Sequence, residues 1–323
     1  MPHAIRIHEH GGAEKLQWEE VPVGDPGPGQ VRVRNRAVGL NFVDTYQRSG
    51  LYPMPLPFIL GSEGAGVVEA VGPKVKEFKV GDRVAYSGPI GAYADVLLRP
   101  ADRLVKIPAG VEDATAAAMM LKGLTAQYLV RRTYRVKKGD TILMHAAAGG
   151  VGQILCQWAR HLGATVIGTV GSDEKAPLAK KAGCKHVIVT SREKVSQRVK
   201  EITRGKGVPV VYDGVGKDTF MDSLDCLQPR GIMVAFGNAS GAVPPFNAGI
   251  LAQKGSLFLT RPTLIHYTAT REDLVSAAKE LFSVVKSGKV KIAVNQTYPL
   301  REAAQAQRDL EARKTTGSTV LIP

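Results

Sequence analysis

Small residues stand at three fixed positions in the segment Ala-Ala-Ala-Gly-Gly-Val-Gly, residues 146–152. Ala147, Gly149 and Gly152 fill the small positions of the fingerprint that binds a dinucleotide pyrophosphate, with Ala147 in place of the usual first glycine. Gly149 lets the backbone approach phosphate oxygens closely, and Gly152 lets the following helix pack tightly. The segment therefore predicts a site for a phosphorylated nucleotide at a helix N-terminus.

The residues on both sides of this segment have the pattern that such a motif requires. An apolar run over 141–145 predicts a strand, residues 151–162 have helical periodicity, and residues 165–170 predict the next parallel strand. A glycine triplet alone would be weak evidence. The order strand, turn, helix, strand favours a nucleotide site over a structural turn.

The residues after the second predicted strand distinguish the two nicotinamide cofactors. In an NAD site an acidic side chain about 20 residues after the glycines binds the ribose 2′-hydroxyl, whereas an NADP site supplies cations for the 2′-phosphate. That distance leads to residues 170–171, followed by Ser172 and Lys175, which favours NADPH. Asp173 and Glu174 keep NADH open as the alternative, although acids in a first helical turn are also favourable by themselves.

Size and composition indicate a globular protein of two domains. The chain has 323 residues, of which 44% are apolar and 22% charged. It has no run of 18 apolar residues and no apolar signal region at its start, so we expect no membrane span and a cytoplasmic location. Cys156, Cys184 and Cys226 lie far apart, which favours reduced, buried thiols over disulfides or a zinc site.

The net charge of +14 would attract polyanions. The lysines and arginines are spread along the chain instead of being collected in a tail or arm. This distribution favours a solvated surface over a patch that binds nucleic acid.

Three regions of the chain differ in pattern. Residues 1–110 predict short strands separated by Gly and Pro, and hence a barrel-like β domain. From about residue 112 strands and helices alternate, which predicts a doubly wound parallel sheet. Helices and a closing strand are predicted after residue 270. We therefore expect a catalytic β domain over 1–122, a dinucleotide-binding domain over 123–261, and a return to the first domain over 262–323, with the active site in the cleft between the domains.

Nearly the whole chain resembles the quinone oxidoreductases of the zeta-crystallin type, in the medium-chain dehydrogenase/reductase superfamily, and particularly their bacterial NADPH-dependent members. The matching stretches are residues 38–44, 61–68, 80–84, 121–125, 146–152, 210–216, 236–241, 260–262 and 317–323. The resemblance implies an α/β fold with a GroES-like, β-barrel-type catalytic domain and a Rossmann cofactor domain. It also implies NADPH as cofactor and a quinone as the acceptor.

The same resemblance shows at which positions zinc ligands of related enzymes are replaced in this chain. Zinc alcohol dehydrogenases of the superfamily carry a cysteine and a Gly-His-Glu triplet where this chain has Asn41 and Gly61-Ser62-Glu63. Neither an amide nor a hydroxyl is the thiolate or imidazole that zinc prefers. We therefore expect no metal site, and the reduction of an already electrophilic acceptor in place of alcohol oxidation.

The resemblance implies three residues near the reacting atoms, Asn41, Tyr46 and Tyr52. They would orient the acceptor against the nicotinamide and hydrogen-bond to the developing oxyanion, without an obligatory proton donor. Ordinary aromatic packing is the alternative for the two tyrosines. For Asn41 a contact with cofactor or substrate is favoured, because it stands where the metal ligand would be.

The resemblance also implies the residues that hold the cofactor. They are Asn41, Thr125, Gly149, Gly150, Val151, Gly152, Gly171, Ser172, Lys175, Phe236, Ser240 and Arg313. Arg313 would contact an anionic group, with an exposed arginine at a helix end as the alternative. Relatives often carry a tyrosine where this chain has Thr190 or Ser191, so a stacking or phosphate contact is expected to be weakened or replaced there.

Two other functions stay open. A reductase of enone or alkenal double bonds needs the same hydride geometry, so the candidate residues do not separate it from a quinone reductase. A non-catalytic role in RNA binding or in structure is supported by the charge of +14 and by the resemblance to zeta-crystallin. Family members are commonly dimers or tetramers; we expect a homodimer, for which the apolar segment 255–260 is a candidate pairing edge.

Histidines outside these motifs are interpreted as structural. His8 and His10 resemble a pair of metal ligands, but no third ligand accompanies them, which favours a solvated strand. His145 immediately precedes the fingerprint and is expected to be an interior residue with satisfied hydrogen bonds.

Overall fold

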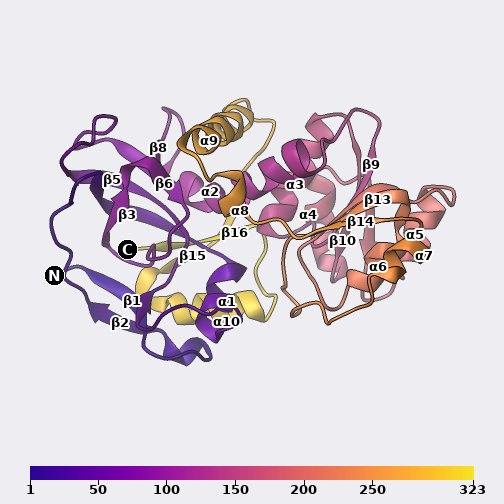
Figure 1. The fold of residues 1–323 in the computed structure, drawn as a ribbon, viewed down its shortest axis with the longest axis horizontal. Coiled ribbons are helices and arrows are strands. Elements are labelled where there is room, and N and C mark those ends of the chain that lie inside the picture. Colours follow the sequence, from indigo (N-terminus) through magenta and orange to yellow (C-terminus); the bar gives the residue numbers. More distant parts are fainter. The chain divides into compact units, whose positions relative to one another are not determined.

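The computed structural model describes residues 1–323 and divides them into two compact units (Figure 1). Unit 1 consists of Met1–Leu124, Thr268–Lys286 and Ile292–Pro323, and unit 2 of Thr125–Tyr267 and Ser287–Lys291. The C-terminal part of the chain therefore folds together with the N-terminal part.

Unit 1 is built from ten strands. They are β1 (His3–Ile7), β2 (Gln17–Glu20), β3 (Gln30–Leu40), β4 (Phe58–Ile59), β5 (Glu63–Val71), β6 (Arg83–Ser87), β7 (Val96–Pro100), β8 (Leu104–Lys106), β15 (Val294–Pro299) and β16 (Ser318–Ile322). One sheet has the order β15-β16-β3-β5-β6-β8, with β7 also paired to β3, and a small sheet has the order β2-β1-β4. All pairs except β15 with β16 are antiparallel.

Strand β3 illustrates why these segments form sheets. Val31 and Val33 are buried in the apolar core of unit 1, whereas Arg32 and Arg34 lie on the opposite face and pair with Glu69. A period of two is the side-chain period of a strand, so one face packs and the other meets water.

Helix α1 (Phe42–Ser49) is the main departure from the predicted β domain, because this region was expected to hold only strands. Its buried residues are polar, which hides it from an analysis of apolar periodicity. It ends at Gly50, whose φ of 81° is left-handed. Unit 1 also contains α9 (Arg271–Lys286) and α10 (Ala303–Glu311), and α2 (Asp113–Tyr128) includes the point at which the units divide.

Unit 2 is a six-stranded sheet in which every pair is parallel. Its strands are β9 (Thr141–Met144), β10 (Thr165–Val170), β11 (His186–Val189), β12 (Val208–Asp213), β13 (Leu227–Ala235) and β14 (Phe258–Thr260). The order β11-β10-β9-β12-β13-β14 is the 3-2-1-4-5-6 order of a doubly wound dinucleotide-binding sheet. The predicted fold class is confirmed, although β14 is shorter than the apolar segment 255–260.

Helices accompany this sheet throughout. They are α3 (Gly150–His161), α4 (Ala176–Lys181), α5 (Val195–Ile202), α6 (Phe220–Asp225), α7 (Gly249–Gln253) and α8 (Leu264–Tyr267). Val199 of α5 and Phe220 and Leu224 of α6 share one core with sheet residues, among them Leu143 and Ile167. The helices thereby bury apolar side chains of the sheet, and the carboxyl ends of its strands lead into loops.

Candidate active site

The fingerprint turn connects β9 to α3 in unit 2. Gly149 directly precedes α3, and the first intrahelical bond runs from Gln153 N to Gly149 O at 2.9 Å. The N–H groups of residues 150–152 therefore have no acceptor within the helix and are placed to bind an anion.

Close packing fixes the identity of Gly152. A Cβ atom at this position would stand 2.3 Å from Ala146 O and 2.8 Å from Ala147 Cα, both backbone atoms. At Gly149 a Cβ would meet only Ala146 O, at 3.2 Å. Residue 152 must therefore be glycine for α3 to approach the turn so closely. At residue 149 the space where a side chain would stand is nearly empty.

The loop after β10 contains Gly171, Ser172 and Lys175. A Cβ at Gly171 would meet nothing within 4 Å, so this side of the loop is open. The neighbouring Asp173 is paired with Arg192, Nη2 to Oδ1 at 2.9 Å, and this partner lowers the pKa of Asp173. The carboxylate that could have bound a ribose 2′-hydroxyl is thus held in an exposed ion pair with Arg192.

The other acid of this loop is also occupied, because Glu174 accepts a hydrogen bond from Ser172 that lowers the pKa of its carboxyl. Thr190, where relatives often have a tyrosine, donates to Val170 O at 3.2 Å and so contributes to the join between β10 and β11. The sequence analysis did not identify Arg192 as a residue of this loop. The one feature that could have indicated it is its position next to Thr190 and Ser191, where relatives often carry a tyrosine.

Loops after β12 and β13 complete this edge of unit 2. Ser240 Oγ donates to Val215 O at 2.9 Å and accepts from Asp218 N at 3.0 Å, so Ser240 joins the two loops. Phe236 is half-buried and lies against Gly214, where an added Cβ would stand 2.9 Å from its ring. Both predicted residues therefore lie at the carboxyl end of the sheet.

Thr125 is buried in α2 and hydrogen-bonds to Tyr128. The predicted cofactor residues from Thr125 to Ser240 all belong to unit 2, whereas Asn41, Tyr46, Tyr52 and Arg313 belong to unit 1. Arg313 is exposed beyond the end of α10 and has a φ of 59°. This is the position that the alternative interpretation, an exposed arginine at a helix end, describes.

Asn41 of unit 1 precedes α1 and is buried. Its Nδ2 donates to Glu63 Oε1 at 2.8 Å. Glu63, which has no exposed surface, also accepts from Leu121 N at 2.6 Å and pairs with Lys122 Nζ at 2.5 Å. The Asn41 amide is therefore held in one orientation by a carboxylate that a buried ammonium neutralises.

These residues do not fit a zinc ion. Asn41, Ser62 and Glu63 offer no thiolate and no imidazole, and the Lys122 ammonium already takes the place of a cation beside Glu63. No group of three or more His, Cys, Asp or Glu side chains is arranged to hold a metal ion. His8 pairs with Glu19 at 2.6 Å and His10 contacts Arg48 O at 3.3 Å, so the two histidines have separate partners.

Tyr46 and Tyr52 pack against each other at the end of α1. Their ring centroids are 5.2 Å apart in an edge arrangement, and Tyr52 N donates to Tyr46 O at 3.0 Å. Both side chains are half-buried. The packing alternative is thus observed for each ring, and their contact with an acceptor stays a prediction.

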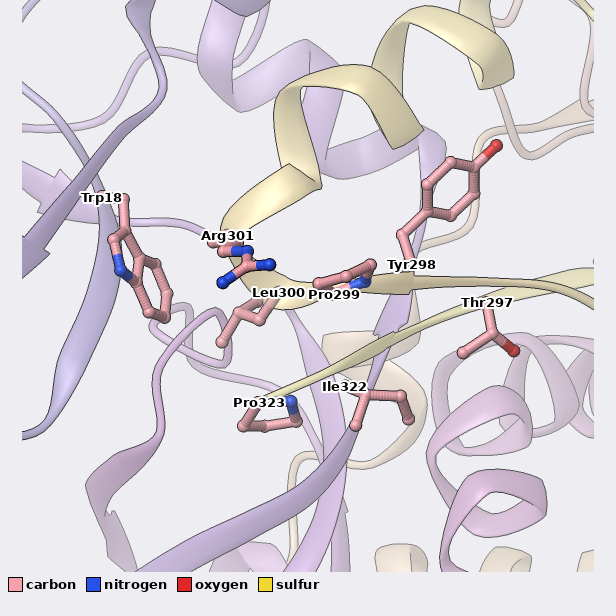
Figure 2. Close-up of a pocket in the computed structure, with 8 residues that line it drawn as sticks. All are labelled: Trp18, Thr297, Tyr298, Pro299, Leu300, Arg301, Ile322 and Pro323. Carbon is pink, nitrogen blue, oxygen red and sulfur yellow. The ribbon is translucent and has the colours of Figure 1, made fainter.

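A pocket of about 500 Å³ lies elsewhere on unit 1 (Figure 2). It is lined by Trp18, Thr297, Tyr298, Pro299, Leu300, Arg301, Ile322 and Pro323. The sequence analysis assigned none of these residues to the site. None of the helices of the structure combines the length and the apolar composition that crossing a membrane requires.

Known families match both halves of the chain. Residues 27–109 match the alcohol dehydrogenase GroES-like domain, and residues 150–287 match the zinc-binding dehydrogenase family. The first match lies in unit 1, and the second begins at Gly150, inside the fingerprint turn, and covers the strands of the parallel sheet that follow β9.

Individual relatives are similar over the full length. A quinone oxidoreductase of Pseudomonas aeruginosa is 57% identical, with 100% of both chains covered. A 2-haloacrylate reductase of Burkholderia sp. is 52% identical, covering 99% of this chain and 98% of the relative. The crystal structure of Escherichia coli quinone oxidoreductase complexed with NADPH matches with a TM-score of 0.98 at 53% identity, covering 99% of this chain and all of the other.

Proposed function

Because this chain belongs to the quinone oxidoreductase family of the medium-chain dehydrogenase/reductase superfamily, we propose that it reduces quinones with NADPH and without a metal ion. The observation that carries the proposal is the loop after β10. There Arg192 pairs with Asp173, while Ser172 and Lys175 suit a 2′-phosphate, in a chain 53% identical to a quinone oxidoreductase crystallised with NADPH.

The residues of unit 2 are assigned to cofactor binding. The N–H groups of Gly150, Val151 and Gly152 bind the pyrophosphate beside Gly149, whose small size lets it come close. When bound, NADPH supplies a hydride from its dihydropyridine ring. The remaining proposed contacts are made by Thr125, Gly171, Ser172, Lys175, Phe236 and Ser240 of unit 2 and by Asn41 and Arg313 of unit 1.

The residues of unit 1 are assigned to orientation of the acceptor. Asn41 is held by Glu63, so its direction is set before any ligand arrives, and preset groups lose little entropy on binding. Tyr46 and Tyr52 offer aromatic faces and hydroxyl groups to a planar acceptor. A quinone is electrophilic enough to accept hydride with this degree of help, and its oxygen is stabilised by hydrogen bonds.

The proposal is tested by NADPH oxidation with simple ortho- and para-quinones, with and without a chelator. We expect turnover that the chelator does not change, and a Michaelis constant at least tenfold lower for NADPH than for NADH, because about 1.4 kcal/mol of phosphate binding suffices for that ratio. Absence of quinone turnover, or loss of activity on chelation, would contradict the proposal.

A second candidate function is the reduction of an activated carbon–carbon double bond. It is favoured by the relative named 2-haloacrylate reductase, whose 52% identity is close to that of the quinone oxidoreductases. Turnover numbers on a panel of quinones, enones, alkenals and 2-haloacrylates, measured with the same preparation, decide between the two. A specificity constant larger for the double-bond substrates would reverse the order of the two candidates.

We further propose a cytoplasmic homodimer. Strand β14 is an edge of the parallel sheet, and Phe258 in it is 62% exposed, which suits pairing with a second copy. The three cysteines are buried and form no disulfide, as in a reducing compartment, although the sulfur atoms of Cys156 and Cys184 lie 3.5 Å apart. Light scattering that gives the mass of a monomer at micromolar concentration would contradict the dimer, and cell fractionation tests the location. The RNA-binding alternative rests on the charge of +14, and a filter-retention assay at physiological salt tests it.

A further inference from the structure

His145 stands between β9 and the fingerprint turn and has no exposed surface. Both of its ring nitrogens have partners from other elements. Nδ1 lies 3.1 Å from Thr169 Oγ1 of β10, and Nε2 lies 2.9 Å from Ser223 Oγ of α6. A fully buried imidazole with two hydroxyl partners joins three elements of unit 2 at the edge where the cofactor loops begin.

Asp213, at the end of β12, fixes which atom donates in each of these hydrogen bonds. Its Oδ2 accepts from Ser223 Oγ at 2.9 Å, and its Oδ1 accepts from the backbone N–H groups of Val215 at 2.8 Å and Gly216 at 3.1 Å. Since the Ser223 proton points to Asp213, Ser223 Oγ must accept from His145, which places the imidazole proton on Nε2.

The other nitrogen is then an acceptor. Burial lowers the pKa of His145, so the ring is neutral and Nδ1 keeps its lone pair. Thr169 therefore donates its hydroxyl proton to Nδ1, and its oxygen is available to accept. The acceptor side of Thr169 faces the fingerprint turn.

Thr169 contacts two successive residues of that turn. Its Oγ1 accepts from Ala146 N at 3.3 Å, and its backbone oxygen accepts from Ala147 N at 2.9 Å. Ala146 has a φ of 52°, a left-handed conformation that residues with a Cβ rarely adopt. The hydroxyl of Thr169 thus stabilises the one strained residue of the turn.

We propose that His145 is a positioning residue for the cofactor, acting with Thr169, Ser223 and Asp213 to fix the fingerprint turn against the end of β10 and the loop after β12. The proposal rests on the proposed function in that the fixed turn is the one assigned to the pyrophosphate. The series of hydrogen bonds continues beyond Asp213. The N–H group of Val215 donates to Asp213, and the backbone oxygen of Val215 accepts from Ser240. A single directional set of hydrogen bonds therefore spans the turn, the end of β10 and the loops that hold Ser240.

The test uses two matched pairs of variants. H145N places an amide where Nδ1 stood and can still accept from Thr169, whereas H145Q places one where Nε2 stood and loses that contact. T169V removes the hydroxyl at nearly constant shape, and T169S restores it. V166A, in the same strand but near its amino end, serves as the control for a purely structural loss, because Val166 is buried and pairs with Ile142 near the start of β9.

Hydrogen exchange of the peptide that covers the turn is measured in the cofactor-free protein, together with the Kd for NADPH and the melting temperature. For T169V and H145Q we expect exchange about tenfold faster and a Kd about tenfold higher, as follows from removing one buried hydrogen-bond partner. T169S is expected to stay within about threefold of wild type. H145N is expected to exchange more slowly than H145Q, because it keeps the direct contact with Thr169 and loses only the one with Ser223, and V166A is expected to lower the melting temperature alone.

The outcomes separate the two proposals. Unchanged exchange in T169V and H145Q, or equal changes in V166A, would overturn the positioning role. Faster exchange in T169V and H145Q, in a protein whose wild type binds no NADPH, would leave the fixed turn standing and remove its assignment to this cofactor.

Discussion

Gly152→Ala is expected to weaken NADPH binding strongly and to destabilise unit 2. The new Cβ would stand 2.3 Å from Ala146 O and 2.8 Å from Ala147 Cα, and neither backbone atom can turn aside as a flexible side chain would. Either α3 moves away from the turn, or the turn opens. Overpacking against backbone costs about 3 kcal/mol, and we expect the Kd for NADPH to rise roughly a hundredfold in the protein that remains folded.

Urea unfolding and fluorescence titration with NADPH measure the two effects. Gly149→Ala separates them, because its Cβ meets only Ala146 O, at 3.2 Å: its stability should change by less than about 1 kcal/mol while the affinity for NADPH falls. Gly24→Ala is the control for a Gly→Ala substitution as such, because its new Cβ would meet nothing within 4 Å. Unaltered NADPH affinity in a folded Gly152→Ala protein would show that the turn does not hold the cofactor.

Local patterns explain how far the sequence analysis reached. Strand β10 has the predicted bounds, because β-branched residues dominate the run over 165–170. The fingerprint turn was located by short-range requirements alone: Gly149 and Gly152 need to be small for reasons that lie within seven residues. The doubly wound sheet followed from the alternation of such segments.

Contacts between residues far apart in the sequence could not be predicted from local patterns. The pairing of Asp173 with Arg192 places a cation beside the carboxylate of the loop after β10, yet 19 residues separate the two. Lys122 reaches Glu63 across 59 residues and gives Asn41 its fixed orientation, a role that no property of Lys122 as a residue type announces. Helix α1 was missed for a related reason, because its buried side chains are polar and are satisfied by tertiary partners such as Gln307, which accepts from Arg48 at 2.6 Å.

Asp44, one of those buried polar residues, is expected to make stability depend on pH. Its carboxyl has no exposed surface, and burial raises its pKa to about 7. Hydrogen bonds from Asn41 N at 2.8 Å and from Tyr93 OH at 2.9 Å oppose the rise, as does Lys122, while Glu63 adds to it. Between the ordinary pKa of 3.8 and about 7, the folded protein holds one proton more than the unfolded chain.

The free energy of unfolding therefore carries a contribution from Asp44 that is complete below pH 4 and is lost as the pH rises to about 7, at about 1.4 kcal/mol per pH unit. D44N removes this dependence. Its amide oxygen can accept from Asn41 N and Tyr93 OH, and its NH2 group can donate to Ser62 Oγ, which lies 3.2 Å from Asp44 Oδ1. The variant thus mimics the protonated acid at every pH.

Urea unfolding of D44N and wild type at pH 5, 6, 7 and 8 measures the effect. The stability of D44N relative to wild type should grow up to about pH 7, by as much as about 4 kcal/mol over the full interval, and stay constant above it. D25N is the matched control, because the side chain of Asp25 is 94% exposed and its loss should give no such growth. A difference between D44N and wild type that stays the same from pH 5 to pH 8 would mean that Asp44 is ionised in the folded protein throughout. The donors around it would then outweigh its burial.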